Sequence, residues 1–330
     1  MNQFAKKLLP FSSLLFLVSL WTFLMPDTFL TLANFRNVLG SASASGIIAA
    51  GMTFVIITAG IDLSVGSMLA FCGMAGAAAM LALSGATWSQ IAGGAAVPLG
   101  TGAMLGGVAA GVAAGLLCGL ANGLLVTRLR LAPFIVTLGT MSVFRGLSHI
   151  LNRTRPISVP SFTLLDTASV CGIPVAVVLF ALVLASCGFL LRRTPFGRHV
   201  YAIGSNVRTA FHAGVAVDRV LVRIYALLGA LTGLAAMIAT SRASSAQPSA
   251  GLSLELDVIA AVIIGGCSPN GGRGTMLGTL VGTLLIAFLR NGLTLLGVVA
   301  QIQLVAVGLI IVVAVASDRL AAAGPSEARG

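Results

Sequence analysis

Long apolar runs, separated by short breaks rich in glycine, proline and polar residues, dominate this sequence. A helix crosses the hydrocarbon core of a bilayer with about 20 apolar residues, and most of the runs are close to that length. They predict about ten membrane-spanning helices, some of them interrupted, near residues 8–25, 40–59, 64–83, 97–120, 133–150, 172–191, 221–241, 257–270, 274–290 and 302–317. We therefore expect an all-α, polytopic helical bundle that forms one transmembrane domain over residues 1–330.

The apolar stretch from Ile91 to Thr127 fits this scheme least well. As one helix it would be about 55 Å long, which is too long for one span and too short for two. We count it as one span with an irregular lead-in around Pro98 and Gly100, and the number of spans near residues 91–127 stays open.

Composition argues against a soluble protein. Charged residues make up 8% of the chain, against about a quarter in an ordinary soluble domain. The net charge is +11, but the basic residues are scattered between apolar runs, so nucleic acid is not an expected partner. With the N-terminus inside, thirteen of the 19 basic residues fall on the cytoplasmic side, which predicts two cytoplasmic termini and an even number of spans.

The first apolar run follows Lys6 and Lys7 and in this respect is similar to a signal peptide. Met25-Pro26-Asp27 after it offers no small-residue cleavage pattern, so we expect an uncleaved first span.

Candidate catalytic chemistry is sparse. Lys6 and Lys7 are the only lysines, so the chain contains no P-loop, and any ATP must be hydrolysed by a partner. His149, His199 and His212 are too far apart for a zinc-protease motif. The five cysteines form no C-x-x-C pair and are interpreted as buried small side chains, not as metal ligands.

Asp62 lies in a polar break between two apolar runs. An ionisable residue at membrane depth is by default a functional hypothesis. The alternative is a helix cap, in which Asp62 or Ser64 accepts hydrogen bonds from free amides of the next span. Both interpretations hold if a broken helix lines a cavity.

Glu255 and Asp257 precede another apolar run, and at i and i+2 they would not share a helix face. One of them is expected to be a cap. The polar segment 244–249 before them is expected on the outer side, as an entrance for a polar solute. The candidate residues of a translocation pathway are Asp62, Ser64, Asn122, Gln247, Glu255 and Asp257.

The segment 265–274 contains too many glycines to be helical and is expected to be a re-entrant or cytoplasmic turn. The segment is also part of a weak internal repeat. The tripeptide VII occurs at 55–57 and at 262–264, and each copy is followed by a polar break. GSML at 66–69 then follows the first break, and GTML at 274–277 follows the second. Paired interrupted helices are typical of transporters, although two matches this short can also arise by chance.

The cytoplasmic loop 192–223 holds six of the thirteen inner basic residues. Its residues 206–214 can form a short helix closed by glycine. Such a loop is suited to binding a soluble partner, and the alternative is a solvated connector.

Eight motifs together resemble the ribose-type permease family of bacterial ATP-binding-cassette (ABC) sugar importers, in family order from about residue 40 to 315. They are GMTFVII at 51–57, GIDLSVGS at 60–67, PFIVTLGT at 133–140, TPFG at 194–197, YAIG at 201–204, SAQP at 245–248, LELDVIAA at 254–261 and GGRGT at 271–275.

The resemblance implies a multi-pass permease subunit of the bacterial inner membrane, embedded in lipid. It implies three partners: ABC ATPase subunits, a second permease chain that is identical or different, and a periplasmic sugar-binding protein. ATP and Mg on the ATPase would drive transport of a monosaccharide such as ribose, xylose or galactose. No cofactor and no covalent chemistry are then expected on this chain.

The resemblance also implies a segment that couples the permease to its ATPase, at about residues 204–214 and before Asp218. Its candidate contacts are Gly204, Asn206, Arg208, Ala210, Gly214 and Asp218. Many relatives carry an acidic residue before paired small residues here, where this chain has Arg208-Thr209-Ala210. This departure affects which ATPase residues are contacted, not whether docking occurs.

An ion-coupled secondary carrier of a polar solute, using Asp62 or Glu255, is the alternative function. A carrier works alone, whereas an ABC permease is silent without its ATPase. A membrane enzyme is a third hypothesis and would need one of these carboxylates for turnover.

Overall fold

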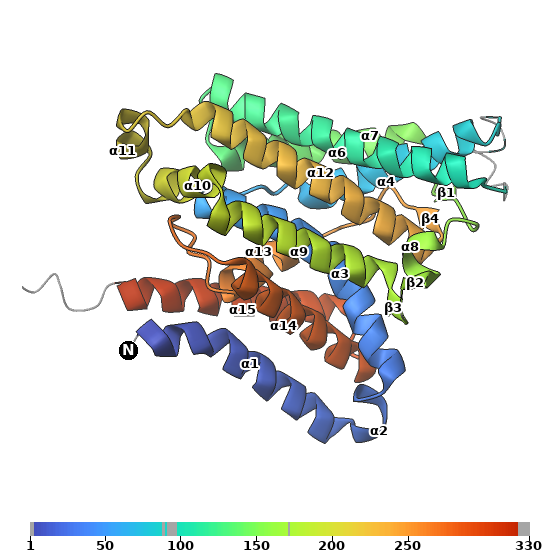
Figure 1. Ribbon diagram of the computed structural model, residues 1–330. Helices are drawn as coiled ribbons and strands as arrows, with labels where there is room; N and C mark the ends of the chain where they lie inside the picture. The colour runs from blue at the N-terminus through green and yellow to red at the C-terminus, as the bar shows by residue number, and fades with distance from the viewer. Residues whose placement is uncertain (1–2, 88–89, 91–97, 171, 323–330) are drawn as a thin grey trace, which may run out of the picture.

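The computed structural model describes residues 3–87, 90, 98–170 and 172–322, which form a bundle of helices lying roughly side by side (Figure 1). Seven helices in the described part of the chain are long and apolar enough to cross a membrane. They are α3 (Leu32–Ile57), α4 (Val65–Leu83), α6 (Thr101–Arg128), α7 (Pro133–Leu151), α9 (Val175–Arg193), α12 (Val217–Ala243) and α14 (Met276–Leu295). The expectation of a helical membrane bundle is confirmed.

The first and last apolar runs also form helices. α1 (Gln3–Leu24) is followed by the single turn α2 (Pro26–Phe29), and α15 (Ala300–Ala322) is the last described element. α1 begins and α15 ends at the same end of the bundle, where the short helices α10 (Pro195–Ser205) and α11 (Val207–His212) lie (Figure 1). We call this the loop-helix end.

Two pairs of short antiparallel strands lie at the opposite end, which we call the strand end (Figure 1). β1 (Ile157–Ser158) pairs with β4 (Ser245–Ala246), and β2 (Ser169–Val170) pairs with β3 (Ile173–Pro174). The single-turn helix α8 (Leu164–Thr167) lies beside them.

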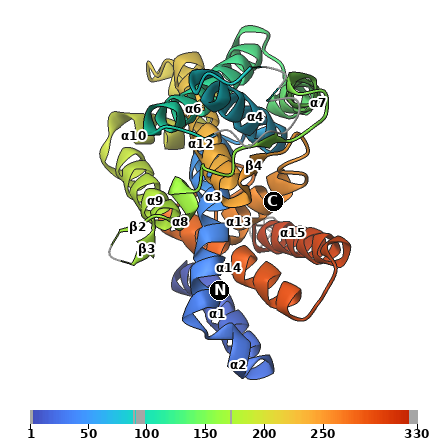
Figure 2. The same cartoon turned by 90° about the vertical axis from the view of Figure 1, so that its right-hand side faces the viewer.

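The helix α3 is the centre of the bundle. Every residue from 46 to 57 is buried, which requires neighbours on all sides, and α3 packs against α9, α12, α13 and α14. Figure 2, viewed from the strand end, shows the other helices arranged around it. A helix that is apolar all round is expected in such a place.

The glycine-rich helix α6 packs closely against α12. A Cβ atom at Gly115 would overlap the Gly229 carbonyl oxygen, so the two backbones are in contact. Small residues permit this approach in lipid. α6 continues eight residues beyond the expected end of its span at residue 120, whereas residues 91–97 of the preceding stretch lie outside the described residues.

The expected span at 257–270 is not one full-length helix. The helix here, α13 (Leu254–Ile264), has 11 residues and is about 16 Å long, roughly half the thickness of a bilayer core. Gly265 and Gly266 end it, and Gly266 has a φ of 91°, in the left-handed region that glycine favours. The segment 265–274 is non-helical, as its glycines indicate.

Candidate translocation pathway

A cavity of about 680 Å³ lies among α3, α4, α12, α13, α14 and α15. α3 and α12 line it with residues 37–45 and 236–243, the parts of both helices that are nearer the strand end. α4 contributes Leu69, Ala70 and Gly73. The volume falls within the range of about 300–1,000 Å³ that is usual for small-molecule sites.

An ion pair between two helices lies on the wall of this cavity. Arg290 of α14 donates from Nη2 to Oδ1 of Asp257 on α13, at 2.7 Å. The Asp257 side chain is 13% exposed, and that of Arg290 is 29% exposed. The pair is therefore largely removed from bulk solvent but remains open to the cavity.

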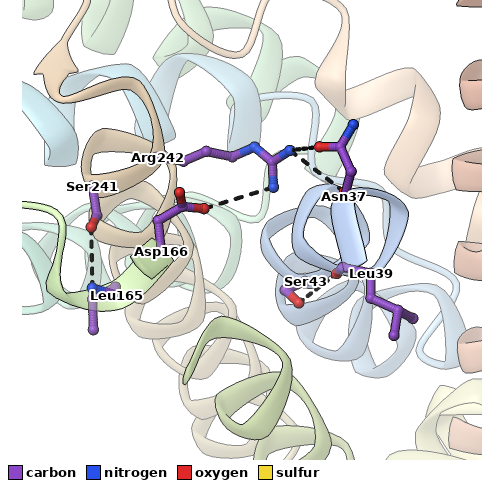
Figure 3. Close-up of polar contacts among 7 residues, drawn as sticks. All are labelled: Asn37, Leu39, Ser43, Leu165, Asp166, Ser241 and Arg242. Carbon is purple, nitrogen blue, oxygen red and sulfur yellow. Dashed lines mark hydrogen bonds and ion pairs between the residues drawn. The ribbon is translucent and has the colours of Figure 1, made fainter. Parts of the chain in front are cut away.

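Arg242, at the end of α12, is one of the residues that line the cavity, and Figure 3 shows its polar contacts. Its guanidinium donates to the Asn37 side chain of α3 and lies 3.8 Å from the Asp166 carboxylate of α8. The neighbouring Ser241 hydroxyl accepts a hydrogen bond from the Leu165 amide at 3.1 Å. These contacts fasten the α8 turn and α3 to the end of α12.

Gln247 also lines the cavity, in the segment that links β4 to α13. Arg145 of α7 holds this segment from Nη1, donating to the carbonyl oxygens of Pro248 at 2.9 Å and Ala250 at 2.8 Å. At Gly251, which has a φ of 68°, a Cβ atom would lie 2.6 Å from the Gly66 carbonyl oxygen. The segment is thus fixed between α7 and the start of α4.

Glu255 and Asp257 face different neighbours, as their spacing predicts. Asp257 reaches α14, whereas the Glu255 carboxylate lies against Gly66 of α4 and interacts electrostatically with Arg145. Neither is the N-cap residue of α13, which is Ser253. Asp257 lines the cavity, and Glu255 is not among its lining residues.

Asp62, Ser64 and Asn122 form one buried cluster away from the cavity. Asp62 Oδ1 accepts hydrogen bonds from the Ser64 amide at 2.8 Å and from its hydroxyl at 2.6 Å. Asn122 of α6 donates to Asp62 Oδ2 at 3.1 Å and to Ser64 Oγ at 2.9 Å. All three side chains are fully buried. The cluster joins α6 to the break between α3 and α4, and the Ser64 side chain does not cap α4.

Three distant segments meet at the other end of α3, in what we call the glycine junction (Ile57, Gly204, Gly271 and Gly272). The Gly272 amide donates to the Ile57 carbonyl oxygen at 2.8 Å. A Cβ atom at Gly204, on α10, would overlap the same oxygen and lie 2.6 Å from the Gly272 nitrogen. At Gly271, which has a φ of 85°, a Cβ atom would lie 2.8 Å from the Gly204 carbonyl oxygen. Main-chain atoms therefore leave no room for a side chain at Gly204, and the positive φ values of Gly271 and Gly272 favour glycine at both positions.

Tyr201 of α10 strengthens this junction from one side. Its hydroxyl donates to the Gly274 carbonyl oxygen at 2.7 Å. Burial raises the pKa of the Tyr201 phenol above its ordinary value, so the hydroxyl remains a donor at neutral pH.

The segment that follows the junction is solvent-facing. The Asn206 side chain caps α11 by accepting from the Thr209 amide at 3.0 Å, and Gly214, with a φ of 82°, closes the turn after it. Arg208 and Asp218 are exposed, whereas Ala210 is buried. Val207 and Phe211, four residues apart, are 50% and 66% exposed, so α11 presents an apolar surface without a partner inside the described chain.

The sequence matches a known transport family over most of its length. A sequence model described as the branched-chain amino acid transport system / permease component matches residues 34–315. The chain belongs to this family. The permease is 46% identical over 318 residues to the ribose import permease protein of Bacillus subtilis, covering 95% of this chain and 93% of that one.

Two further relatives extend the comparison. The ribose import permease protein of Haemophilus influenzae is 40% identical over 314 residues, which cover 93% of this chain and 91% of that one. The D-allose transport system permease protein of Escherichia coli is 38% identical over 312 residues, which cover 94% and 90%. No solved structure gives a significant match. The permease is accordingly a multi-pass inner-membrane transport subunit.

Sequence reasoning did not single out several polar residues of the cavity. They are Asn37, Arg242, Thr283, Arg290, Asn291 and Gln303. Arg242 and Arg290 both lie at the end of an apolar run. The available signal was their position, because an arginine at the end of a long apolar run needs a partner or a water-filled cavity.

Proposed function

We propose that the permease is the membrane-spanning subunit of an ABC importer that carries a monosaccharide. The observation that carries this proposal is the similarity, over more than nine-tenths of the chain, to proteins named as ribose and D-allose permeases. The cavity supports it, because a wall of hydroxyl, amide and paired ionic groups suits a neutral polyhydroxylated solute better than an apolar one.

The proposed topology has ten crossings with both termini in the cytoplasm. Nine crossings use α1, α3, α4, α6, α7, α9, α12, α14 and α15. The extended segment 244–253 and the half-length helix α13 together make the remaining one, because α12 ends at the strand end and α13 leads to the glycine junction. The strand end then faces the periplasm, and the loop-helix end faces the cytoplasm.

In this orientation the cavity is the periplasmic half of the pathway. A sugar-binding protein would deliver the sugar at the strand end, near Arg242, and Gln247 and Asp257 would line its route. Asp62, Ser64, Asn122 and Glu255 would act on the pathway indirectly, by fixing the broken ends of α3, α4 and α13.

The coupling segment from Gly204 to Gly214 would dock on separate ATPase subunits. Its exposed Val207, Arg208 and Phe211 provide a surface for that contact, and Asn206, Ala210 and Gly214 hold the short helix in shape. Asp218 would add an exposed charge beside it. ATP and Mg would bind only on the ATPase, and a second permease chain would complete the pore.

Co-purification from the native host tests this proposal. The tagged permease should retain an ATP-binding subunit in near-equal amount when it is extracted in detergent, as mass spectrometry can measure. The reconstituted complex should then take up one sugar from a panel of ribose, allose, xylose and galactose, and only with ATP. A lone permease that transports without ATP would instead establish an ion-coupled carrier, which the names of the relatives do not favour.

A further inference from the structure

The helix α14 contributes four polar residues to the wall of the cavity. Thr283, Arg290, Asn291 and Thr294 all line the cavity. The spacing of seven residues between Thr283 and Arg290 places them on the same helix face. Helical side chains lean toward the N-terminus of their helix, so the guanidinium of Arg290 leans toward Thr283.

Thr283 differs from other buried threonines of the permease. The hydroxyls of Thr53 and Thr232 donate to carbonyl oxygens one turn earlier in their own helices, both at 2.8 Å. The Thr283 hydroxyl is equally buried, at 2% exposure, yet it makes no hydrogen bond within the described residues. A buried hydroxyl without a partner is destabilising, and a polar guest in the adjoining cavity would supply the missing hydrogen bond.

Arg290 also has a buried polar atom without a hydrogen-bond partner. Its Nη2 bonds to Asp257, but its buried Nε makes no hydrogen bond within the described residues. Thr283, Arg290 and Asp257 therefore place a hydroxyl, a guanidinium and a carboxylate in the wall of one cavity. Because Asp257 neutralises Arg290, the wall favours a neutral hydrogen-bonding solute over a free anion.

We propose that Thr283, Arg290 and Asp257 form a transient binding station for one neutral sugar ring inside the cavity. The inference rests on the proposed function. The described residues that line the cavity include no aromatic side chain, so the ring has no stacking platform and is held by hydrogen bonds alone. Such binding is weak and quickly reversible, as passage through a pore requires.

The test uses the reconstituted transporter with its ATPase and its binding protein. Thr283→Val removes the hydroxyl and keeps the shape, Thr283→Ser restores it, and Thr232→Val is the matched control for a hydroxyl outside the cavity. We expect Thr283→Val to lower the maximal uptake of the sugar that the wild-type complex carries, out of the panel of ribose, allose, xylose and galactose, about fivefold, while sugar-stimulated ATP hydrolysis persists. Thr283→Ser and Thr232→Val should retain uptake within twofold.

A binding measurement on the purified permease distinguishes the loss of the binding station from a general loss of folding. Saturation-transfer NMR with the carried sugar at millimolar concentration should show contact with wild-type and Thr232→Val protein, and the signal should fall at least threefold in Thr283→Val. Wild-type uptake together with a wild-type NMR signal in Thr283→Val would contradict the binding station and leave the proposed function intact. If the wild-type complex carries no sugar of the panel, the proposed function fails and the station fails with it.

Discussion

The cavity and the glycine junction differ in what forms them, because side chains line the cavity and backbone contacts form the junction. In the cavity, side chains of Thr283 and Arg290 line an open space and leave hydrogen-bonding atoms unpaired. At the junction, backbone atoms of Ile57, Gly204 and Gly272 are in direct contact, and the Gly272 amide is paired with the Ile57 carbonyl oxygen.

This difference predicts different responses to mutation. At the cavity, a side chain can be exchanged without moving a helix, so substitutions should change the rate of transport. At Gly204 of the junction, even one added methyl group must separate main-chain segments, so a substitution there should disconnect α10 from α3 and from the loop before α14. The permeability barrier is therefore expected at the junction and solute contact at the cavity.

Gly204→Ala is expected to have the largest effect. The new Cβ atom would overlap the Ile57 carbonyl oxygen, and such overpacking costs about 1–3 kcal/mol. We expect uptake by the reconstituted complex to fall below a tenth of wild type, with loss of sugar-stimulated ATP hydrolysis. The control is Gly188→Ala on α9, where a Cβ atom would lie 3.7 Å from Met276, an ordinary contact. Wild-type uptake by Gly204→Ala would contradict a tightly packed junction.

Phe211→Ala tests whether α11 provides the contact that couples the ATPase to the junction. Removal of this exposed ring should lower the amount of co-purifying ATPase about tenfold and uncouple ATP hydrolysis from sugar, without changing the thermal unfolding of the permease. Phe189→Ala on α9 is the matched control, because that ring is similarly exposed, at 62%. If ATPase recovery and sugar-stimulated hydrolysis are unchanged in Phe211→Ala, α11 does not carry the coupling contact.

The helices were predictable because apolar length and breakers are local properties of the chain. All ten expected segments contain a helix, including α13. The half-length of α13 was not predicted, because the apolar run alone does not reveal that the preceding segment 244–253 enters the bundle. Its entry depends on Arg145, which lies about a hundred residues away in the sequence.

The functional geometry was predictable only in part, for the same reason. Gln247 and Asp257 stand out as polar residues beside apolar runs, and both line the cavity. The junction brings together residues 57, 204 and 272, and each looks like an ordinary glycine turn or helix end in sequence. The repeat of VII at 55–57 and 262–264 marks the ends of α3 and α13, which are the two breaks that adjoin the junction.

Asp62→Ala should have an intermediate effect and tests whether the buried cluster behaves like the junction or like the cavity. The substitution leaves the Ser64 amide and hydroxyl without their acceptor, at about 1–3 kcal/mol each, and removes one of the two hydrogen bonds that Asn122 donates. We expect a lower temperature of unfolding and about fivefold less uptake, with the ATPase still bound. Asp62→Asn keeps one oxygen acceptor and should lose less. Abolished uptake in Asp62→Asn with unchanged unfolding would favour ion coupling through this carboxylate instead.

Tyr201→Phe should have the smallest effect, and it separates backbone packing from side-chain bonding at the junction. The substitution removes the hydrogen bond to the Gly274 carbonyl oxygen, which contributes about 0.5–1.5 kcal/mol. Tyr201 is only half buried, so water can replace the lost donor. Uptake should therefore change less than twofold, while Gly204→Ala in the same assay is nearly inactive. A Tyr201→Phe variant as inactive as Gly204→Ala would mean that the phenol, and not the contact between backbones, holds the junction closed.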